Sequence, residues 1–258
     1  MIYDCCCFFN ENELLELRLN TLDEVVDKFV IVESNRTFAG KPKPQNFETE
    51  RFASFKDKII YVFIENMPPF IDPWQYENYQ RNYILEVLKN ENATDNDIII
   101  ISDLDEIASV EAIKQYKKNP NGIVGLSLKF YNGYLNLFNE TETPWLKARI
   151  LSYKDFNITK PLSPTDVRFA RMSYIIKNAG WHFSYMGGVE RIMEKLREFA
   201  HQEFNNDYYV NKERIEECLK NNTDILARKH FYKKVELDET FPKYLLENQD
   251  KYKEMILP

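Results

Sequence analysis

The sequence predicts an α/β fold with a mostly parallel sheet in its N-terminal half. Short apolar runs alternate with segments of helical periodicity over the first hundred residues. This alternation of strands and helices is typical of a parallel sheet with right-handed crossovers. The predicted strands cover residues 2–9, 29–32, 59–64 and 97–101. After Gly122 the sequence becomes alternating and aromatic, so we expect a mixed or antiparallel C-terminal half.

The helices expected between these strands each have an apolar face. Leu15, Leu19 and Leu22 recur at helical spacing, and Ile84, Val87 and Leu88 do the same before the fourth strand. Further helices are expected at residues 110–118, after Gly187–Gly188 as far as residues 201–203, and around Ile215 and Leu245. Additional strands are expected at residues 145–151 and 172–176.

The most informative segment is residues 97–107, where four isoleucines are followed at once by Asp103, Asp105 and Glu106. Clustered carboxylates beside a core require protonation, protein cations or a metal ion. Three interpretations remain open at this point. The segment is a solvated acidic turn, the nucleophile motif of a haloacid-dehalogenase-like phosphohydrolase, or the Asp-x-Asp motif of a nucleotide-sugar transferase, whose carboxylate oxygens suit Mg²⁺ or Mn²⁺.

Composition narrows the class of protein. The chain has 258 residues, 44% of them hydrophobic, which is enough for a full core. A net charge of -7 and a pI near 5.2 argue against general nucleic-acid binding, which needs a basic surface. Three adjacent cysteines, Cys5 to Cys7, suit a reducing compartment, and no apolar stretch approaches the roughly 18 residues of a transmembrane helix. We therefore expect a cytoplasmic protein without a transmembrane segment.

Several longer motifs are distinctive in combination: the opening YDCCCFFNENELLELRLNTLDEVVDKFVIVESNRTFAGKPKP, YQRNYI, IIISDLDEI, GWHFSYMGG, LREFAHQEFN and PKYLL. Together they resemble glycosyltransferase family 17, the β-1,4-mannosyl-glycoprotein β-1,4-N-acetylglucosaminyltransferase family. The resemblance implies a single GT-A-like domain over residues 1–258, with a Rossmann-like parallel sheet. Residues 1–120 would form the nucleotide-sugar half, residues 121–205 the acceptor and metal half, and residues 206–258 a helical extension.

The resemblance also implies an inverting, metal-dependent transfer of N-acetylglucosamine from UDP-N-acetylglucosamine to a glycan. The animal members of the family are membrane-anchored, whereas this chain shows no anchor, which leaves the acceptor and the linkage open. We expect Asp105 to bind Mn²⁺ or Mg²⁺, with Asp103 at the ribose or the metal shell. His182 is the expected ligand from the C-terminal half, with His201 as its substitute. The alternative for His182 is a hydrogen-bonded core histidine.

For the nucleotide, the predicted strand ends carry Asn10, Glu11, Glu33 and Arg36, where a parallel sheet meets its ligand. Arg81 is a candidate for binding phosphate, although a helix-face arginine is commonly a salt-bridge partner.

An inverting transfer also needs a carboxylate base, and we expect Glu190 after the Gly-Gly turn, with Asp166 and Glu203 as rivals. A helix-start glutamate that only complements the dipole is the alternative. The aromatic residues Phe130, Tyr131, Tyr134 and Trp145 suit sugar stacking or core packing. A scaffold that only binds glycans is a further alternative, and the intact Asp103 and Asp105 argue against it.

Overall fold

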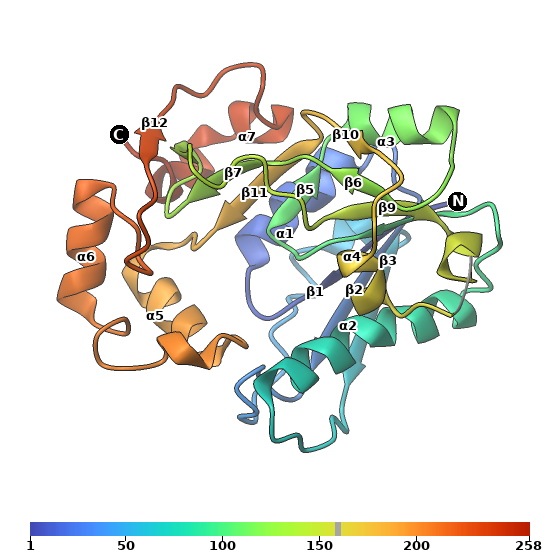
Figure 1. Cartoon of the computed structure of the whole chain (residues 1–258), viewed down its shortest axis with the longest axis horizontal. Helices are drawn as coiled ribbons and strands as arrows, with labels where there is room; N and C mark the ends of the chain where they lie inside the picture. Colours follow the sequence, from blue (N-terminus) through green and yellow to red (C-terminus); the bar gives the residue numbers. More distant parts are fainter. Residues whose placement is uncertain (158–160) are drawn as a thin grey trace.

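In the computed structural model, which describes residues 1–157 and 161–258, the chain forms a mixed α/β domain with two sheets (Figure 1). The strands of the first sheet are β1 (Ile2–Cys7), β2 (Lys28–Ser34), β3 (Ile59–Ile64), β4 (Ile98–Ile101), β6 (Val124–Leu126), β9 (Arg149–Ser152) and β10 (Ile175–Ile176). The strands of the second sheet are β5 (Glu106–Ala108), β7 (Lys129–Asn132), β8 (Leu137–Asn139), β11 (Gly180–Ser184) and β12 (Tyr232–Lys234).

The first sheet has the order β10-β6-β9-β4-β1-β2-β3. Strands β1 to β4 run parallel, which confirms the expected parallel pairing of the first hundred residues. Strand β9 is antiparallel to both β4 and β6, so the sheet becomes mixed where the second half of the chain joins it. The second sheet, β12-β8-β7-β11-β5, is also mixed, as its alternating sequence predicted.

The α-helices cover the sheets and connect their strands. They are α1 (Asn12–Leu22), α2 (Pro73–Asn90), α3 (Val110–Lys118), α4 (Pro164–Phe169), α5 (Gly188–Glu198), α6 (Lys212–Asn221) and α7 (Lys243–Glu247). Figure 1 shows α2 running along the strands β1 to β3, while α5 and α6 lie together at one side of the molecule. In the part of the chain that the structure describes, no helix is long and apolar enough to cross a bilayer.

The central strands are buried on both faces, which explains their continuous apolar sequence. Side chains of one face of β1 and β4 pack with the α1 leucines, and those of the other face pack with Ile84, Val87 and Leu88 of α2. Within this core, β4 is completely buried, and its last residue, Ile101, is followed directly by the acidic turn.

The expected boundaries differ from the structure in the second half of the chain. The strand expected at 145–151 is reduced to β9, and only Ile175–Ile176 of the segment 172–176 forms a strand. Helix α5 ends at Glu198 rather than near residue 203, because Phe199 adopts an extended conformation. A separate 3-10 turn, Gln202–Phe204, follows it. Phe199 continues the apolar face of Ile192 and Leu196 at helical spacing, so the sequence did not show this break.

Candidate functional site

A cavity of about 610 Å³ lies where the strands of the parallel sheet end. Its lining includes Phe8 and Glu11 after β1, Arg36 after β2, and Asp103 and Asp105 after β4. The second half of the chain contributes further walls from β7, β11, α4 and α5. The cavity is therefore built from both halves of the chain, at the edge of the sheet where parallel α/β folds bind ligands.

The turn Ser102–Asp105 is held from below by Arg18, a residue of α1 that is 1% exposed. Its guanidinium forms an ion pair with the equally buried Asp4 of β1, at 2.6 Å. The other N–H groups of Arg18 fix the turn by donating to the Ser102 hydroxyl at 2.6 Å and to the carbonyl oxygens of Asp103, Leu104 and Glu106 at 2.7, 3.1 and 3.1 Å. A buried cation with all its donors used is a rigid support for the two aspartates above it.

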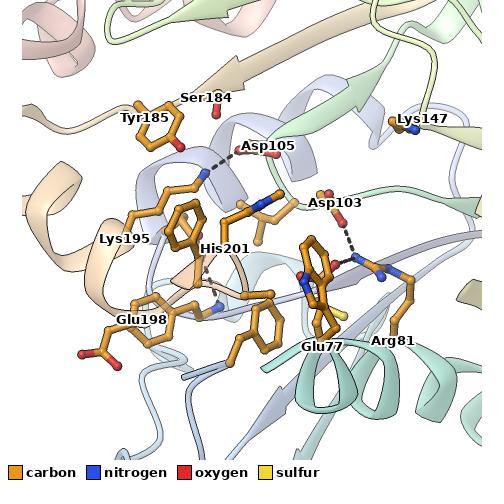
Figure 2. A pocket seen from close by; sticks show the side chains of 18 of the residues that line it. Glu77, Arg81, Asp103, Asp105, Lys147, Ser184, Tyr185, Lys195, Glu198 and His201 are labelled. Atoms are coloured by element: carbon orange, nitrogen blue, oxygen red, sulfur yellow. Dashed lines mark hydrogen bonds and ion pairs between the residues drawn. The ribbon is translucent and has the colours of Figure 1, made fainter. Parts of the chain in front are cut away.

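Asp103 faces the cavity between two arginines. One carboxylate oxygen accepts a hydrogen bond from Arg81 at 3.0 Å, and the other accepts one from Arg168 of α4. Burial raises the pKa of this carboxyl, but the charges of Arg168 and Arg81 outweigh burial and hold the pKa of Asp103 below its usual range. Figure 2 shows Arg81 between Asp103 and Glu77, its other partner at 2.6 Å. Asp103 is therefore ionised at neutral pH.

Asp105 pairs with two residues of the C-terminal half. Its Oδ2 lies 2.9 Å from the Lys195 Nζ of α5, and its Oδ1 lies 3.4 Å from the His182 Nε2 of β11. Figure 2 shows Lys195 pointing at Asp105 from beside Tyr185. Burial raises the pKa of Asp105, but Lys195 and His182 hold that pKa far below the usual aspartate range. The same ion pair raises the pKa of Lys195 against the effect of burial.

His182 packs against two aromatic rings that also contact each other. Its imidazole stacks on Phe130 with a centroid distance of 4.5 Å and an interplanar angle of 16°. Trp145 contacts the imidazole at the same centroid distance of 4.5 Å, with an interplanar angle of 34°, and lies 5.4 Å from the Phe130 ring. The Nδ1 atom is buried without a hydrogen-bond partner among the described residues, so Nε2 alone makes a polar contact, and that contact is with Asp105. The predicted histidine and aspartate therefore do meet.

Glu106 begins β5 and is completely buried. It accepts hydrogen bonds from Arg168 at 2.6 and 2.7 Å and from the backbone N–H of Asp103 at 2.8 Å. It also accepts one from the indole N–H of Trp145. All of these donors belong to residues that line the cavity. Glu106 therefore holds these lining residues in place and does not face a ligand.

The profile of glycosyltransferase family 17 matches residues 1–258. The chain belongs to glycosyltransferase family 17. Human β-1,4-mannosyl-glycoprotein 4-β-N-acetylglucosaminyltransferase is 32% identical to this family 17 chain over 137 residues, which is 50% of the chain and 24% of the relative. The enzymes of the same name from rat and mouse are 32% and 31% identical, over 50% of the chain and 23% of each relative. The chain thus spans about a quarter of the length of these curated relatives.

Of the residues expected to bind the nucleotide or the metal ion, seven line the cavity of this family 17 chain. They are Glu11, Arg36, Arg81, Asp103, Asp105, His182 and His201. Asn10 and Glu33 do not line it. Asn10 donates to Glu194 at 2.8 Å, and Glu33 is fully buried, where it accepts hydrogen bonds from Lys43, the Asn46 backbone and Tyr61. Glu33 therefore anchors the loop of residues 41–47, because its side chain turns into the protein rather than toward the ligand side.

Glu190 also lies outside the cavity lining. Its side chain is 73% exposed and pairs with Lys212 of α6 at 3.0 Å. Asp166, one of its rivals, caps α4, whereas the other rival, Glu203, lines the cavity. The first turn of α5 presents the Glu190 side chain to solvent, so the structure does not bring it to the cavity.

The four aromatic residues that were expected to stack on a sugar or to pack in the core fall into two groups. Phe130 and Trp145 line the cavity, and both rings contact His182. Tyr131 instead packs in the core against Phe183 and Phe241, and Tyr134 packs against the cluster formed by α5 and α6. Core packing thus accounts for two of these four residues, and ligand contact is possible for the other two.

The sequence reasoning missed Arg18, Arg168, Lys195 and Lys147. For Arg18 a signal existed, since it lies on the same helical face as Leu15, Leu19 and Leu22, and Asp4 interrupts an apolar strand. Opposite charges in two apolar segments indicate a buried pair. Arg168, Lys195 and Lys147 are separated from Asp103 and Asp105 by at least 40 residues, so only the fold brings them to the cavity.

The residues present fit a divalent metal ion in part. In residues 1–157 and 161–258, no group of three or more His, Cys, Asp or Glu side chains is arranged to hold a metal ion. Asp105 and His182 form a pair, however, and their 3.4 Å separation is close to the spacing of about 3 Å between neighbouring ligands of one ion. Such an ion would need oxygen ligands from a bound substrate and from water to complete its shell.

Proposed function

We propose that this chain transfers N-acetylglucosamine from UDP-N-acetylglucosamine to a glycan, and that the cavity is its active site, in a GT-A-type arrangement. The observation that carries the proposal is the Asp105–His182 pair, 3.4 Å apart in a cavity at the carboxyl ends of parallel strands. The proposal is supported by family membership and by the activity that the names of the relatives state. Because the aligned part is a small fraction of those enzymes, the donor and the acceptor are both part of the proposal.

Mn²⁺ or Mg²⁺ would be held by Asp105 and His182 and, when bound, neutralises charge on the departing diphosphate. Lys195 keeps the Asp105 carboxylate ionised and oriented, because it occupies the oxygen that does not face His182. Asp103 is oriented by Arg81 and Arg168 toward the ribose or a water of the metal shell. These ion pairs fix the acidic groups before any ligand arrives, which reduces the cost of ordering them.

The nucleoside end of the donor is assigned to Glu11 and Arg36, which line the cavity after β1 and β2. Glu11 is already fixed, because its carboxylate accepts the backbone N–H groups of Phe9 and Asn10 at 3.2 and 3.1 Å. Asn10 and Glu33 support this region from outside the cavity. The acceptor side is assigned to the wall that contains Trp74, Phe199 and His201.

The general base of this proposal is Glu203 instead of Glu190. Glu203 lines the cavity beside His201, whose Nδ1 lies 2.7 Å from its carboxylate. A base must reach the hydroxyl whose proton it takes, and among the carboxylates considered from the sequence, Glu203 meets that condition best. It takes the proton of the acceptor hydroxyl as that oxygen bonds to the sugar carbon and the diphosphate leaves.

The alternatives from the sequence receive less support. A phosphohydrolase of the haloacid-dehalogenase type would use the first aspartate of the motif as a free nucleophile, whereas Asp103 is bound by two arginines. The family match also points to a transferase. A non-catalytic glycan-binding scaffold would not need the two aspartates that Arg18, Arg81 and Lys195 hold in place.

The test is a screen of donor turnover over a panel of nucleotide sugars, with and without Mn²⁺. We expect hydrolysis or transfer to be fastest with UDP-N-acetylglucosamine, to require the metal and to stop in EDTA. Turnover of simple phosphoesters without turnover of any nucleotide sugar would overturn the proposal in favour of the phosphohydrolase. Binding of UDP without any turnover, over a panel of oligosaccharide acceptors, would favour the scaffold.

A further inference from the structure

The cations that line the cavity differ in whether they have an anionic partner. Five of them form ion pairs with carboxylates: Lys43, Arg81, Arg168, Lys195 and Arg228. Among the described residues, Arg36 and Lys147 also line the cavity but pair with no carboxylate. Arg36 donates to the Gly40 carbonyl at 2.9 Å, whereas the Lys147 Nζ lies over the ring of Phe169, 4.9 Å from its centroid. Lys147 thus brings a positive charge that the protein does not neutralise.

The pairing of the strands places Lys147 beside the acidic turn. Strand β9 is antiparallel to β4, with Arg149 opposite Ile101, the last residue of β4. Lys147 precedes β9 by two residues, so it lies at the end of β4 from which Asp103 and Asp105 project. Arg36 approaches the same edge of the sheet from the other side, after β2. An anion bound above the turn would therefore have one unpaired cation on each side.

The ring beneath Lys147 supports the same conclusion. Phe169 is 63% exposed, an unusual position for a large apolar side chain, and it directly follows Arg168, which binds Asp103. An amine held over an exposed ring keeps most of its hydrogen-bonding capacity, since the ring accepts no conventional hydrogen bond. Lys147 is therefore positioned near the cavity, with its three N–H donors available to a ligand.

We propose that Lys147 binds the diphosphate of the nucleotide donor on the β9 side of the acidic turn. This inference rests on the proposed function, because it takes the donor to be a nucleoside diphosphate sugar. Phosphate oxygens are strong acceptors, and a lysine ammonium binds them as a point charge. The bound anion would neutralise Lys147 without breaking any of the five existing ion pairs.

The experiment compares the binding of UDP and of uridine by calorimetry, in the presence of Mn²⁺. The test variant is Lys147→Met, and Lys147→Arg is the variant that keeps the charge. Lys154→Met is the matched control, because Lys154 is exposed just after the other end of β9 and does not line the cavity. We expect Lys147→Met to weaken UDP binding by about tenfold or more, and uridine binding to change less than twofold. Lys147→Arg should retain most of the UDP affinity, and Lys154→Met all of it.

Each outcome decides a separate question. If the wild type prefers UDP to uridine and Lys147→Met binds UDP normally, Lys147 does not bind the diphosphate and the inference is wrong. If the affinity for uridine falls as much as the affinity for UDP, the variant acts on the nucleoside site. That result would also overturn the inference. If the wild type binds neither ligand, the proposed donor is wrong and the inference falls with it. A weaker dependence of UDP binding on salt in Lys147→Met would add support, since one charge contact is lost.

Discussion

Arg18 and Asp4 form an ion pair in which both side chains are 1% exposed, with 2.6 Å between Nη2 and Oδ1. The pair connects α1 to β1 directly beneath the turn that carries Asp103 and Asp105. Two charges are expensive to bury, and a pair of this kind usually contributes less to stability than an apolar replacement would. Its value here lies in the position of the guanidinium, which fixes three carbonyl oxygens of the turn.

Arg18→Met should therefore destabilise the protein by about 3–5 kcal/mol, because it leaves Asp4 charged and buried without a partner. The double variant Asp4→Asn with Arg18→Met should recover part of that loss but should still bind UDP and Mn²⁺ poorly, since the turn has lost its support. Urea unfolding measures the first effect and calorimetry the second. Normal UDP binding by a folded double variant would show that the turn holds its shape without Arg18.

Asp105→Asn should weaken the binding of Mn²⁺ in the presence of UDP by roughly 100-fold or more, because it removes the charge of a direct ligand. Transfer should be nearly abolished while the circular dichroism spectrum stays unchanged. Asp207→Asn is a suitable control, because Asp207 is exposed and outside the cavity lining. Full activity of Asp105→Asn in EDTA would exclude a metal at this position.

His182→Phe separates the two interpretations of that histidine. A phenyl ring can keep the stacking on Phe130 and the contact with Trp145 but lacks the nitrogen that faces Asp105. We expect the melting temperature to change by only a few degrees and the affinity for Mn²⁺ with UDP present to fall strongly. A large loss of stability with unchanged metal affinity would identify His182 as a core residue.

Glu16 of α1 makes the attachment of the C-terminal segment sensitive to pH. Its carboxylate accepts hydrogen bonds from Lys251, from Tyr244 at 2.8 Å and from Arg51 at 3.0 Å. Burial raises the pKa of this carboxyl, but the three donors outweigh burial and hold the pKa below the usual glutamate range. A carboxyl with a lowered pKa in the folded state stabilises the fold above its unfolded pKa of about 4.3, and this contribution is lost as the pH falls through the folded value.

The difference in unfolding free energy between the wild type and Glu16→Gln should therefore be constant near neutral pH. It should shrink as the pH is lowered below about 4.3. Glu140→Gln is the control, since Glu140 is exposed and forms no ion pair within the described residues. Denaturant titrations at several pH values measure the difference. If the difference in unfolding free energy between the wild type and Glu16→Gln grew toward acid pH, the lowered pKa of Glu16 would be contradicted.

Glu203→Gln should lower turnover by roughly 10²-fold with little change in donor affinity, as loss of a general base would. Glu190→Gln should retain turnover within about twofold, because its exposed side chain contacts Lys212 rather than the cavity. Steady-state rates of both variants decide between them. The opposite result would return the catalytic role to Glu190 and would require α5 to move on substrate binding.

The sequence predicted the framework well because local patterns determine it. The apolar runs of β1 to β4 and the leucine spacing of α1 are set by burial, and burial is visible in a single sequence. The proximity of Asp105 and His182 was also expected, although 77 positions separate the two residues. Asp105 follows a buried strand, and His182 lies in a strand that ends at a turn. Pairing of β5 with β11 now explains this proximity, with Glu106 opposite His182.

The direction of individual side chains could not be predicted in the same way. Glu11 and Glu33 both follow apolar strand segments, yet one faces the cavity and the other turns inward to fix a loop. Glu190 lies in the first turn of a helix, and only the rotation of that helix decides that it faces Lys212. Lys195 and Arg168 carry no motif at all. Their importance follows from the carboxylates they neutralise, which only the tertiary structure identifies.

The four residues Ser102–Asp105 have a mechanical role as well, because they connect β4 of the first sheet to β5 of the second. Asp105 is tied to the second sheet by its carbonyl, which accepts the Phe183 N–H at 2.8 Å, while Ser102 donates its N–H to Cys5 of the first sheet at 3.3 Å. Any rocking of one sheet against the other would be transmitted to the spacing of the two aspartates. A ligand that binds both aspartates would therefore restrain the motion of the two sheets relative to each other.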